Sequence, residues 1–154
     1  MKRLVAALAC VSMLSGCSLY QAYAQREAIR QAAFHLKGVS LDGMDLTGAN
    51  VTVTLELENP TETEIALDRI DYVLFVNDLR ALSGSTPQPI HVPAHDVRPL
   101  PIHATLRFRD VSNELRQAFI TRGRFTYRLE GTGHFDTPFG PIDYPIHVAP
   151  VIAQ

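Results

Sequence analysis

The fold is decided by residues 50–60, NVTVTLELENP, in which polar and apolar side chains alternate up to an Asn-Pro pair. A period of two is typical of a β-strand that buries one face and leaves the other in water. The apolar positions are Val51, Val53, Leu55 and Leu57. Proline cannot donate a hydrogen bond to a sheet, so Asn59 and Pro60 are expected to end this strand and begin a turn.

The same alternation recurs in three later runs, at residues 100–108, 125–130 and 142–148. Weaker candidates for strands are residues 35–42, 69–77, 80–85 and 88–92. Turn-forming residues, such as Asn77-Asp78 and Phe139-Gly140-Pro141, separate these segments. Many short strands with one polar face each, and no long helices between them, predict an all-β, antiparallel β-sandwich.

One short helix is expected at about residues 110–121. Its apolar side chains recur at helical spacing and are Val111, Leu115, Ala118 and Phe119. Asp110 is expected to cap the start of the helix, and Arg122-Gly123 to close it. The apolar stripe is expected to pack against the open end of the sandwich.

Composition excludes several classes of protein. The chain has 154 residues, a formal net charge of −2 and 46% hydrophobic residues, which suits one folded domain rather than a disordered chain. It lacks the basic excess that neutralises phosphate backbones, so no nucleic-acid partner is expected. Two cysteines cannot form a disulfide scaffold or a thiolate zinc site by themselves.

Residues 1–16, MKRLVAALACVSMLSG, have the basic start and short apolar core of a secretory signal peptide. The segment Leu14-Ser15-Gly16-Cys17 resembles the bacterial lipobox, in which the cysteine receives acyl chains such as palmitate and the signal is cut just before it. This resemblance implies a lipid anchor on Cys17; the alternative is a secreted protein with a chance cysteine. Ser18 is not the aspartate that retains lipoproteins at the inner membrane, so the resemblance implies the outer membrane, facing the periplasm.

Residues 17–34 are expected to carry the lipid and to tether the domain that follows. This segment is rich in Gln and Ala, and its apolar positions do not decide between a short helix and a flexible spacer. The sandwich domain is expected over residues 35–150. No segment of the chain repeats at a fixed period, so a solenoid is not expected.

Residues 51–85 resemble the WHy (water stress and hypersensitive response) domain of type 2 late embryogenesis abundant (LEA) proteins. The resemblance rests on the strand that ends at Asn59-Pro60, the Tyr72–Val76 strand with its tight turn, and Gly84. Later segments extend it over about residues 35–150, although Thr61 stands where the family commonly has asparagine. The family implies an immunoglobulin-like or fibronectin-III-like sandwich, a role in desiccation and heat tolerance, and no catalytic residues.

The six histidines do not form a recognisable metal motif. They are His35, His91, His95, His103, His134 and His147. A zinc site needs three or four converging ligands, and the closest pair, His91 and His95, lies across Pro93 rather than on a helix. Exposed, titratable side chains are therefore favoured, and no metal or cofactor is expected.

Paired carboxylates do not indicate an active site here. Glu56 and Glu58 share the polar face of one strand, but acid–base chemistry needs a pocket that separates their pKa values. A solvated sheet surface is favoured, with Arg107, Arg124 or Arg128 as cross-strand partners. The chain also lacks a GxSxG motif and a thiol nucleophile, so we expect no catalytic residue and no enzyme.

The loop of residues 136–141, DTPFGP, carries Phe139 at a tip rich in proline and glycine. Phe139 could contact a partner or a membrane, or it could fold back over an end of the core. The favoured function is a membrane-tethered stress-protection module whose clients are proteins or membranes. The alternative is an envelope assembly or transport accessory that docks a protein or lipid through a sheet edge or the Phe139 loop.

Overall fold

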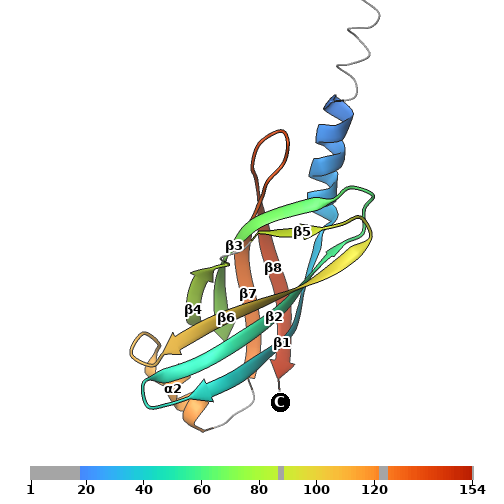
Figure 1. Ribbon diagram of the computed structural model, residues 1–154. Coiled ribbons are helices and arrows are strands. Elements are labelled where there is room, and N and C mark those ends of the chain that lie inside the picture. Colours follow the sequence, from blue (N-terminus) through green and yellow to red (C-terminus); the bar gives the residue numbers. More distant parts are fainter. Residues whose placement is uncertain (1–17, 87–88, 122–124, 154) are drawn as a thin grey trace, which may run out of the picture.

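The structure is a computed structural model that describes residues 18–86, 89–121 and 125–153. In order, residues 18–31 are helical and are followed by β1 (Ala33–Met44), β2 (Gly48–Asn59), β3 (Ile65–Val76), β4 (Leu79–Ser85), β5 (Ile90–Val92), β6 (Asp96–Arg107), α2 (Asn113–Ile120), β7 (Phe125–Phe135) and β8 (Ile142–Ala153) (Figure 1). Several residues named in the sequence analysis lie outside the described residues: the signal segment of residues 1–16, Cys17, Arg122-Gly123 and Arg124.

The strands form two antiparallel sheets (Figure 1). The first has the order β1-β2-β6, and the second has the order β4-β3-β7-β8, with β5 paired to the start of β3. The predicted all-β antiparallel sandwich is confirmed. Every predicted strand overlaps an observed one, and most of the observed strands extend further at one or both ends.

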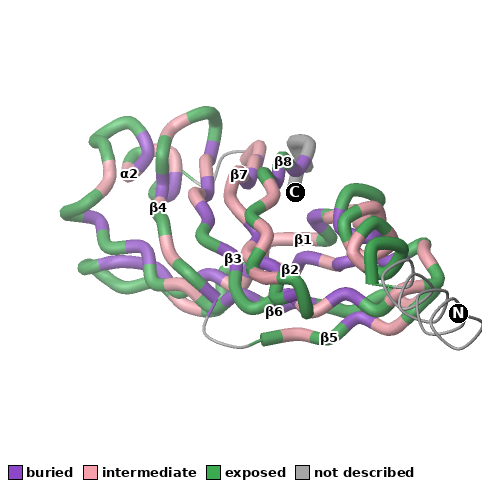
Figure 2. The backbone as a smooth tube through the Cα atoms, turned by 90° about the horizontal axis from the view of Figure 1, so that it is seen from above, coloured by how far each residue is buried: buried purple, intermediate pink, exposed green. Residues whose placement is uncertain are grey.

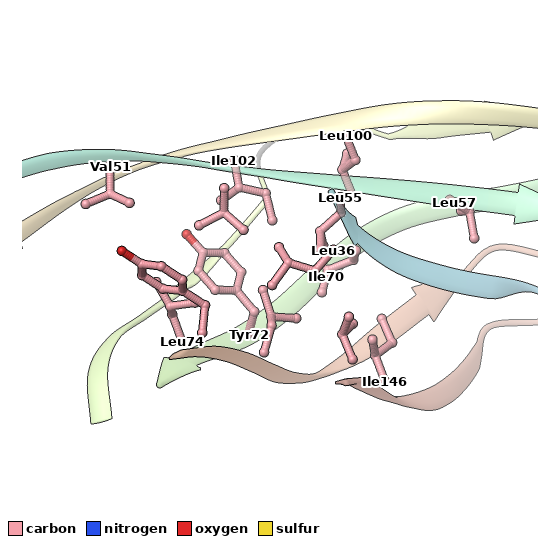
Figure 3. Close-up of a cluster of buried hydrophobic side chains, with 14 of the residues drawn as sticks. Leu36, Val51, Leu55, Leu57, Ile70, Tyr72, Leu74, Leu100, Ile102 and Ile146 are labelled. Carbon is pink, nitrogen blue, oxygen red and sulfur yellow. The ribbon is translucent and has the colours of Figure 1, made fainter. Parts of the chain in front are cut away.

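Inward-facing side chains of both sheets form one hydrophobic core between them (Figure 3). The alternating residues of β2 supply much of it: Val51, Val53, Leu55 and Leu57 are each at most 4% exposed. Ile70 and Leu74 of β3 face them from the second sheet and are equally buried. Figure 2 shows this alternation of buried and exposed residues along the strands. Full burial of each such side chain stabilises the fold by about 1.5–3 kcal/mol, so this core is the main stabilising element.

Strand β3 is longer than the predicted segment 69–77 because a β-bulge changes which positions face inward. Ile65 and Leu67 are buried, and the next buried position is Ile70 rather than residue 69. The pairing of β3 with β7 shifts register between Leu67 and Arg69, which accounts for the extra residue. A period of two breaks at such a bulge, so alternation alone identifies only the second half of the strand.

The tyrosine and glycine of the family pattern contact one another directly. Tyr72 on β3 pairs with Gly84 on β4, and a Cβ atom on Gly84 would lie 2.7 Å from the Tyr72 hydroxyl oxygen. Only glycine leaves room for the tyrosine ring at this position. The side chain of Tyr72 lies among the core residues, between Ile70 and Leu74 on the inward face of β3, and is 6% exposed (Figure 3).

Two prolines lie inside β6, which nevertheless pairs with β2 residue by residue from Asp96 to Arg107. Strand β6 is at the edge of its sheet and has β2 on one side only. Pro99 and Pro101 have no backbone N–H, which a central strand could not tolerate. On an edge strand the same residues remove hydrogen-bond donors from the open side of the sheet.

The predicted helix at 110–121 is present but starts later, at Asn113. Ser112 caps it instead of Asp110: the Ser112 hydroxyl oxygen accepts a hydrogen bond from the backbone N–H of Leu115 at 3.2 Å. Asp110 lies in the preceding turn, where its N–H donates to the carbonyl of Arg107. Leu115 is fully buried, so α2 covers one end of the core as expected.

The segment before β1 is helical over residues 18–31, which decides between the two forms left open by its sequence. Ala28 and Ile29 are 0% and 1% exposed and belong to the core. The Gln25 side-chain amide donates to the backbone carbonyl of Glu64 at 3.0 Å, ahead of β3. The last turns of this helix are therefore packed on the sandwich.

Candidate functional site

The amide of Asn59 is completely buried at the point where β2 ends. Its two N–H donors lie within hydrogen-bond distance of three backbone carbonyl oxygens, those of Thr63 at 2.8 Å, Pro93 at 2.9 Å and Val92 at 3.1 Å, so one donor is shared. Its oxygen accepts hydrogen bonds from the backbone N–H of Thr61 at 3.1 Å and from the Thr61 hydroxyl at 2.8 Å. Every polar atom of the side chain is thus satisfied inside the protein.

These bonds join the two sheets. Asn59 ends β2 in the first sheet, whereas Val92 ends β5, which pairs with β3 in the second. Pro60 follows directly and supplies the chain reversal, as the sequence indicates. The Asn-Pro motif is therefore a structural connection between sheets, which is more than the plain turn expected from sequence. Thr61 supports the same connection through its hydroxyl, in place of the family's asparagine.

We expect Asn59→Asp to lower the free energy of unfolding by about 3 kcal/mol, measured by urea denaturation. The substitution keeps the shape of the side chain but replaces the donating nitrogen with an oxygen that faces three carbonyl oxygens. Asn50→Asp is the matched control, because Asn50 is exposed on the same strand and only accepts a hydrogen bond, from Thr105. An equal loss of stability in both variants would contradict this assignment.

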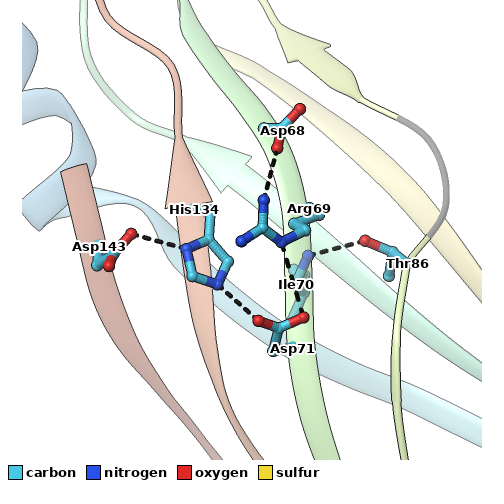
Figure 4. A network of polar contacts seen from close by, with 7 residues as sticks. All are labelled: Asp68, Arg69, Ile70, Asp71, Thr86, His134 and Asp143. Carbon is cyan, nitrogen blue, oxygen red and sulfur yellow. Dashed lines mark hydrogen bonds and ion pairs between the residues drawn. The ribbon is translucent and has the colours of Figure 1, made fainter. Parts of the chain in front are cut away.

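A polar cluster lies on the outer face of the second sheet, where His134 on β7 sits between β3 and β8 (Figure 4). Its Nδ1 is 2.7 Å from a carboxylate oxygen of Asp143, and its Nε2 is 2.8 Å from one of Asp71. Arg69 approaches the other oxygen of Asp71 at 3.8 Å. The imidazole is only 17% exposed, so one side chain holds three neighbouring strands together.

Both ring nitrogens face acceptors, which favours the doubly protonated imidazolium. The hydrogen bond with Asp143, followed by that with Asp71, raises the pKa of His134 above its ordinary 6.5. A hydrogen bond from Ser85, followed by the one with His134, lowers the pKa of Asp71 below 3.8. The ion pair between Asp71 and His134 is therefore present at every pH above the pKa of Asp71 and below the pKa of His134.

Because the pKa of His134 is higher in the folded than in the unfolded chain, its stabilisation is complete below about pH 6.5 and is lost as pH rises through the folded-state pKa. We expect the free energy of unfolding to decrease as the pH is raised above about 6.5 and through the folded-state pKa of His134. The His134→Gln variant should lose this dependence, as measured by urea unfolding across pH. His147→Gln, at an exposed position of β8, should retain the original profile; the same flattening in both variants would argue against the cluster.

Carboxylates pair with other histidines across the surface as well. The pairs are His35 with Glu58 at 3.2 Å, His91 with Glu64 at 3.0 Å and His95 with Glu62 at 2.9 Å. We expected arginines to pair with Glu56 and Glu58. Neither Arg107 nor Arg128 does so, and Arg124 lies outside the described residues. Strand β1 lies beside β2 and supplies Lys37 to Glu56 at 2.9 Å and His35 to Glu58. Arg128 instead lies over the ring of Phe75.

In the described ranges, no group of three or more His, Cys, Asp or Glu side chains is arranged to hold a metal ion. One histidine contacts a hydroxyl: His103 Nδ1 is 2.8 Å from the Thr52 oxygen. That hydroxyl donates its single proton to Asp42 at 2.5 Å, so His103 must donate to Thr52 rather than accept from it. This geometry does not activate a nucleophile, which would require the ring to act as base.

The Phe139 loop is a compact turn. The Thr137 hydroxyl donates to the carbonyl of Gly140 at 2.6 Å and accepts from the N–H of Phe139 at 3.2 Å. Gly140 has φ +111, a conformation that favours glycine. The Phe139 ring is 51% exposed while Thr137 is buried, so the loop presents the ring half in solvent.

The residues singled out from sequence do not converge on one site. Asn59 and Pro60 are structural, Phe139 is on the β7–β8 loop, and Cys17 lies outside the described residues. Sequence reasoning missed the His134 cluster, although a β7–β8 hairpin would have placed His134 opposite Asp143. None of the helices in the described part of the chain is both long and apolar enough to span a bilayer.

The fold and the Asn-Pro connection define the chain as a small antiparallel β-sandwich domain with its polar clusters on the outer faces of the sheets. A family model described as "Late embryogenesis abundant protein" (LEA_2) matches residues 54–149. The chain therefore belongs to the type 2 late embryogenesis abundant family, which confirms the resemblance seen in sequence. No curated protein sequence matches the chain.

Solved structures with the same fold include members of this family. The solution structure of AT1g01470 from Arabidopsis thaliana has a TM-score of 0.62 at 18% identity, covering 77% of this chain and 78% of that one. The solution structure of At2g46140.1, described as a late embryogenesis abundant protein, has a TM-score of 0.54 at 17% identity, covering 92% and 86%. A crystal structure of a protein from Archaeoglobus fulgidus has a TM-score of 0.52 at 10% identity, covering 77% and 96%.

Proposed function

We propose that the chain is a membrane-anchored, non-enzymatic protection module of the bacterial envelope, which stabilises proteins or membranes during desiccation or heat. The observation that carries the proposal is the family match over residues 54–149, which runs from β2 into β8 and so takes in most of the sandwich. The match is to the domain as a whole rather than to a short motif. Stress tolerance is the role with which this family is associated.

An anchor at Cys17 is supported by the helix that follows it. The helical residues Leu19, Tyr20 and Tyr23 are 73%, 73% and 68% exposed, whereas the last turns of the same helix are packed on the sandwich. Tyrosine, with an apolar ring and a polar tip, suits the interface between a bilayer and water. Each acyl CH₂ buried in lipid contributes about 0.8 kcal/mol, and more than one chain gives durable anchoring.

The position of Phe139 supports a membrane contact at the same end. The β7–β8 loop lies at the end of the molecule where the N-terminal helix projects (Figure 1). A lipid on Cys17 would therefore bring the half-exposed ring towards the bilayer that holds it. This arrangement favours the membrane over a separate protein as the surface that Phe139 meets.

The anchor is tested by labelling cells that express the chain with a palmitate analogue and separating outer from inner membrane. We expect label in the outer-membrane fraction for the natural chain and for Cys10→Ser, and none for Cys17→Ser. Cys10 is the matched control, since it lies in the signal segment. Label that persists in Cys17→Ser would contradict lipidation, and label in the inner membrane would contradict the sorting.

Protection is tested with client enzymes that aggregate when dried or heated. We expect the chain to keep more enzyme soluble than an unrelated sandwich protein of equal mass, and a strain without the chain to survive drying less well. Equal protection by the unrelated protein would overturn the proposal. Crosslinking in intact envelopes distinguishes a protection module from an envelope assembly or transport accessory. Many different crosslinked proteins would support protection, and one stoichiometric partner would support the accessory.

A further inference from the structure

An open groove of about 870 Å³ lies at the end of the sandwich where β1 turns into β2 and β6 leads to α2. The β1–β2 hairpin forms one wall, through residues 43–50. Three arginines line the groove: Arg107 at the end of β6, Arg109 just after it and Arg116 on α2. Strand β1 runs from the N-terminal helix to this hairpin, so the groove and the helix are at opposite ends of the molecule (Figure 1).

The positive charge of these arginines is only partly compensated. Arg109 approaches Asp110 at 3.5 Å, and its side chain remains 74% exposed. Arg116 donates to the neutral Asn113, and Arg107 has no acidic partner among the described residues. A second groove of about 510 Å³ also contains Arg107 and adds Arg80. Among the described residues, Arg80, Arg107 and Arg116 have no carboxylate partner and lie together at this end, whereas Arg26, the other arginine without one, lies on the N-terminal helix.

The acidic side chain in the wall of the larger groove is already occupied. One carboxylate oxygen of Asp45 accepts hydrogen bonds from the backbone N–H of Thr47 at 2.6 Å, the Thr47 hydroxyl at 2.7 Å and the N–H of Gly48 at 3.0 Å. These bonds lower the pKa of Asp45, and the bond from the Thr47 hydroxyl has the largest effect. Asp45 therefore fixes the shape of the hairpin turn rather than pairing with the arginines.

The rigid turn presents apolar side chains to solvent. Leu46 at its tip is 98% exposed, and the neighbouring Met44 and Leu41 are 46% and 52% exposed. Isolated exposed apolar residues are common on proteins, but here Met44 and Leu46 line the same groove as the three arginines. Apolar side chains beside cations fit the boundary between anionic headgroups and acyl chains.

We propose that this end of the sandwich docks on a bilayer surface that carries anionic phospholipids, with Arg107, Arg109 and Arg116 holding lipid phosphates. Guanidinium groups bind phosphate oxygens through paired N–H donors, and the groove is wide enough for a headgroup. Leu46 and Met44 enter the headgroup layer beside them. The docking stands independently of the proposed function; with the anchor at Cys17, it would place the far end of the domain on a second membrane surface.

Docking is tested by flotation of the chain from Ser18 onwards, which contains every strand and helix of the described fold, with vesicles. The vesicles are phosphatidylcholine alone or equal parts of phosphatidylcholine and phosphatidylglycerol. We expect binding only with phosphatidylglycerol, weakening as salt is raised. Near a membrane each arginine contributes about fivefold in affinity, so Arg107→Gln with Arg109→Gln should weaken binding by about 25-fold.

Arg98→Gln is the matched charge control, because Arg98 is exposed at the opposite end of the same strand, β6. Leu46→Ser should weaken binding by about fivefold. Val97→Ser is the apolar control, at a residue 45% exposed beside Arg98. All of these positions are exposed or half-exposed, and thermal unfolding of each variant verifies that the fold is retained.

Three results would overturn the proposal. Equal binding to phosphatidylcholine alone would exclude recognition of anionic lipid. Equal loss in Arg98→Gln and in the Arg107/Arg109 variant would exclude the groove. Binding of glycerol phosphate or inorganic phosphate that depends on Arg107 and Arg109, without vesicle binding, would assign the groove to a soluble phosphate ligand instead of a membrane.

Discussion

The buried amide of Asn59 is the constraint on which the arrangement of the two sheets depends. A sandwich holds its sheets together mainly by apolar contact, which is strong but has no direction. The Asn59 side chain adds direction, since it bonds carbonyl groups of two separate loops and leaves no polar atom unsatisfied. A fully satisfied buried polar group specifies one arrangement, because any shift of the loops would leave buried carbonyls without donors.

The outer faces of the sheets are organised by a different interaction, the pairing of histidine or lysine with carboxylates across strands. His134 is the strongest case, with an acceptor on each ring nitrogen and a strand on each side. The exposed pairs contribute little singly. His134 is more enclosed, and it couples the registers of β3, β7 and β8. The chain thus uses many of its acidic residues as structural partners.

Sequence predicts this fold well where a strand follows one period, as in β2, and less well where the backbone departs from it. The bulge in β3 shifts the inward face between Leu67 and Ile70, so no single period describes the strand. The start of α2 was misplaced because Asp110 and Ser112 are both good capping residues, and tertiary packing of Leu115 selects the second. The His134 cluster was missed because Asp71 and His134 are brought together only by pairing of strands far apart in sequence. The Asn-Pro motif was found, but its bonds to Val92 and Pro93 depend on the same long-range pairing.

The prolines of β6 have a consequence for how the molecule behaves when water is scarce. As a solution dries, protein molecules are forced together, and an open sheet edge can then recruit strands from its neighbours and start a fibre. Pro99 and Pro101 interrupt the row of donors along that edge. Copies of this domain that meet along β6 therefore find fewer backbone donors with which to pair strand to strand.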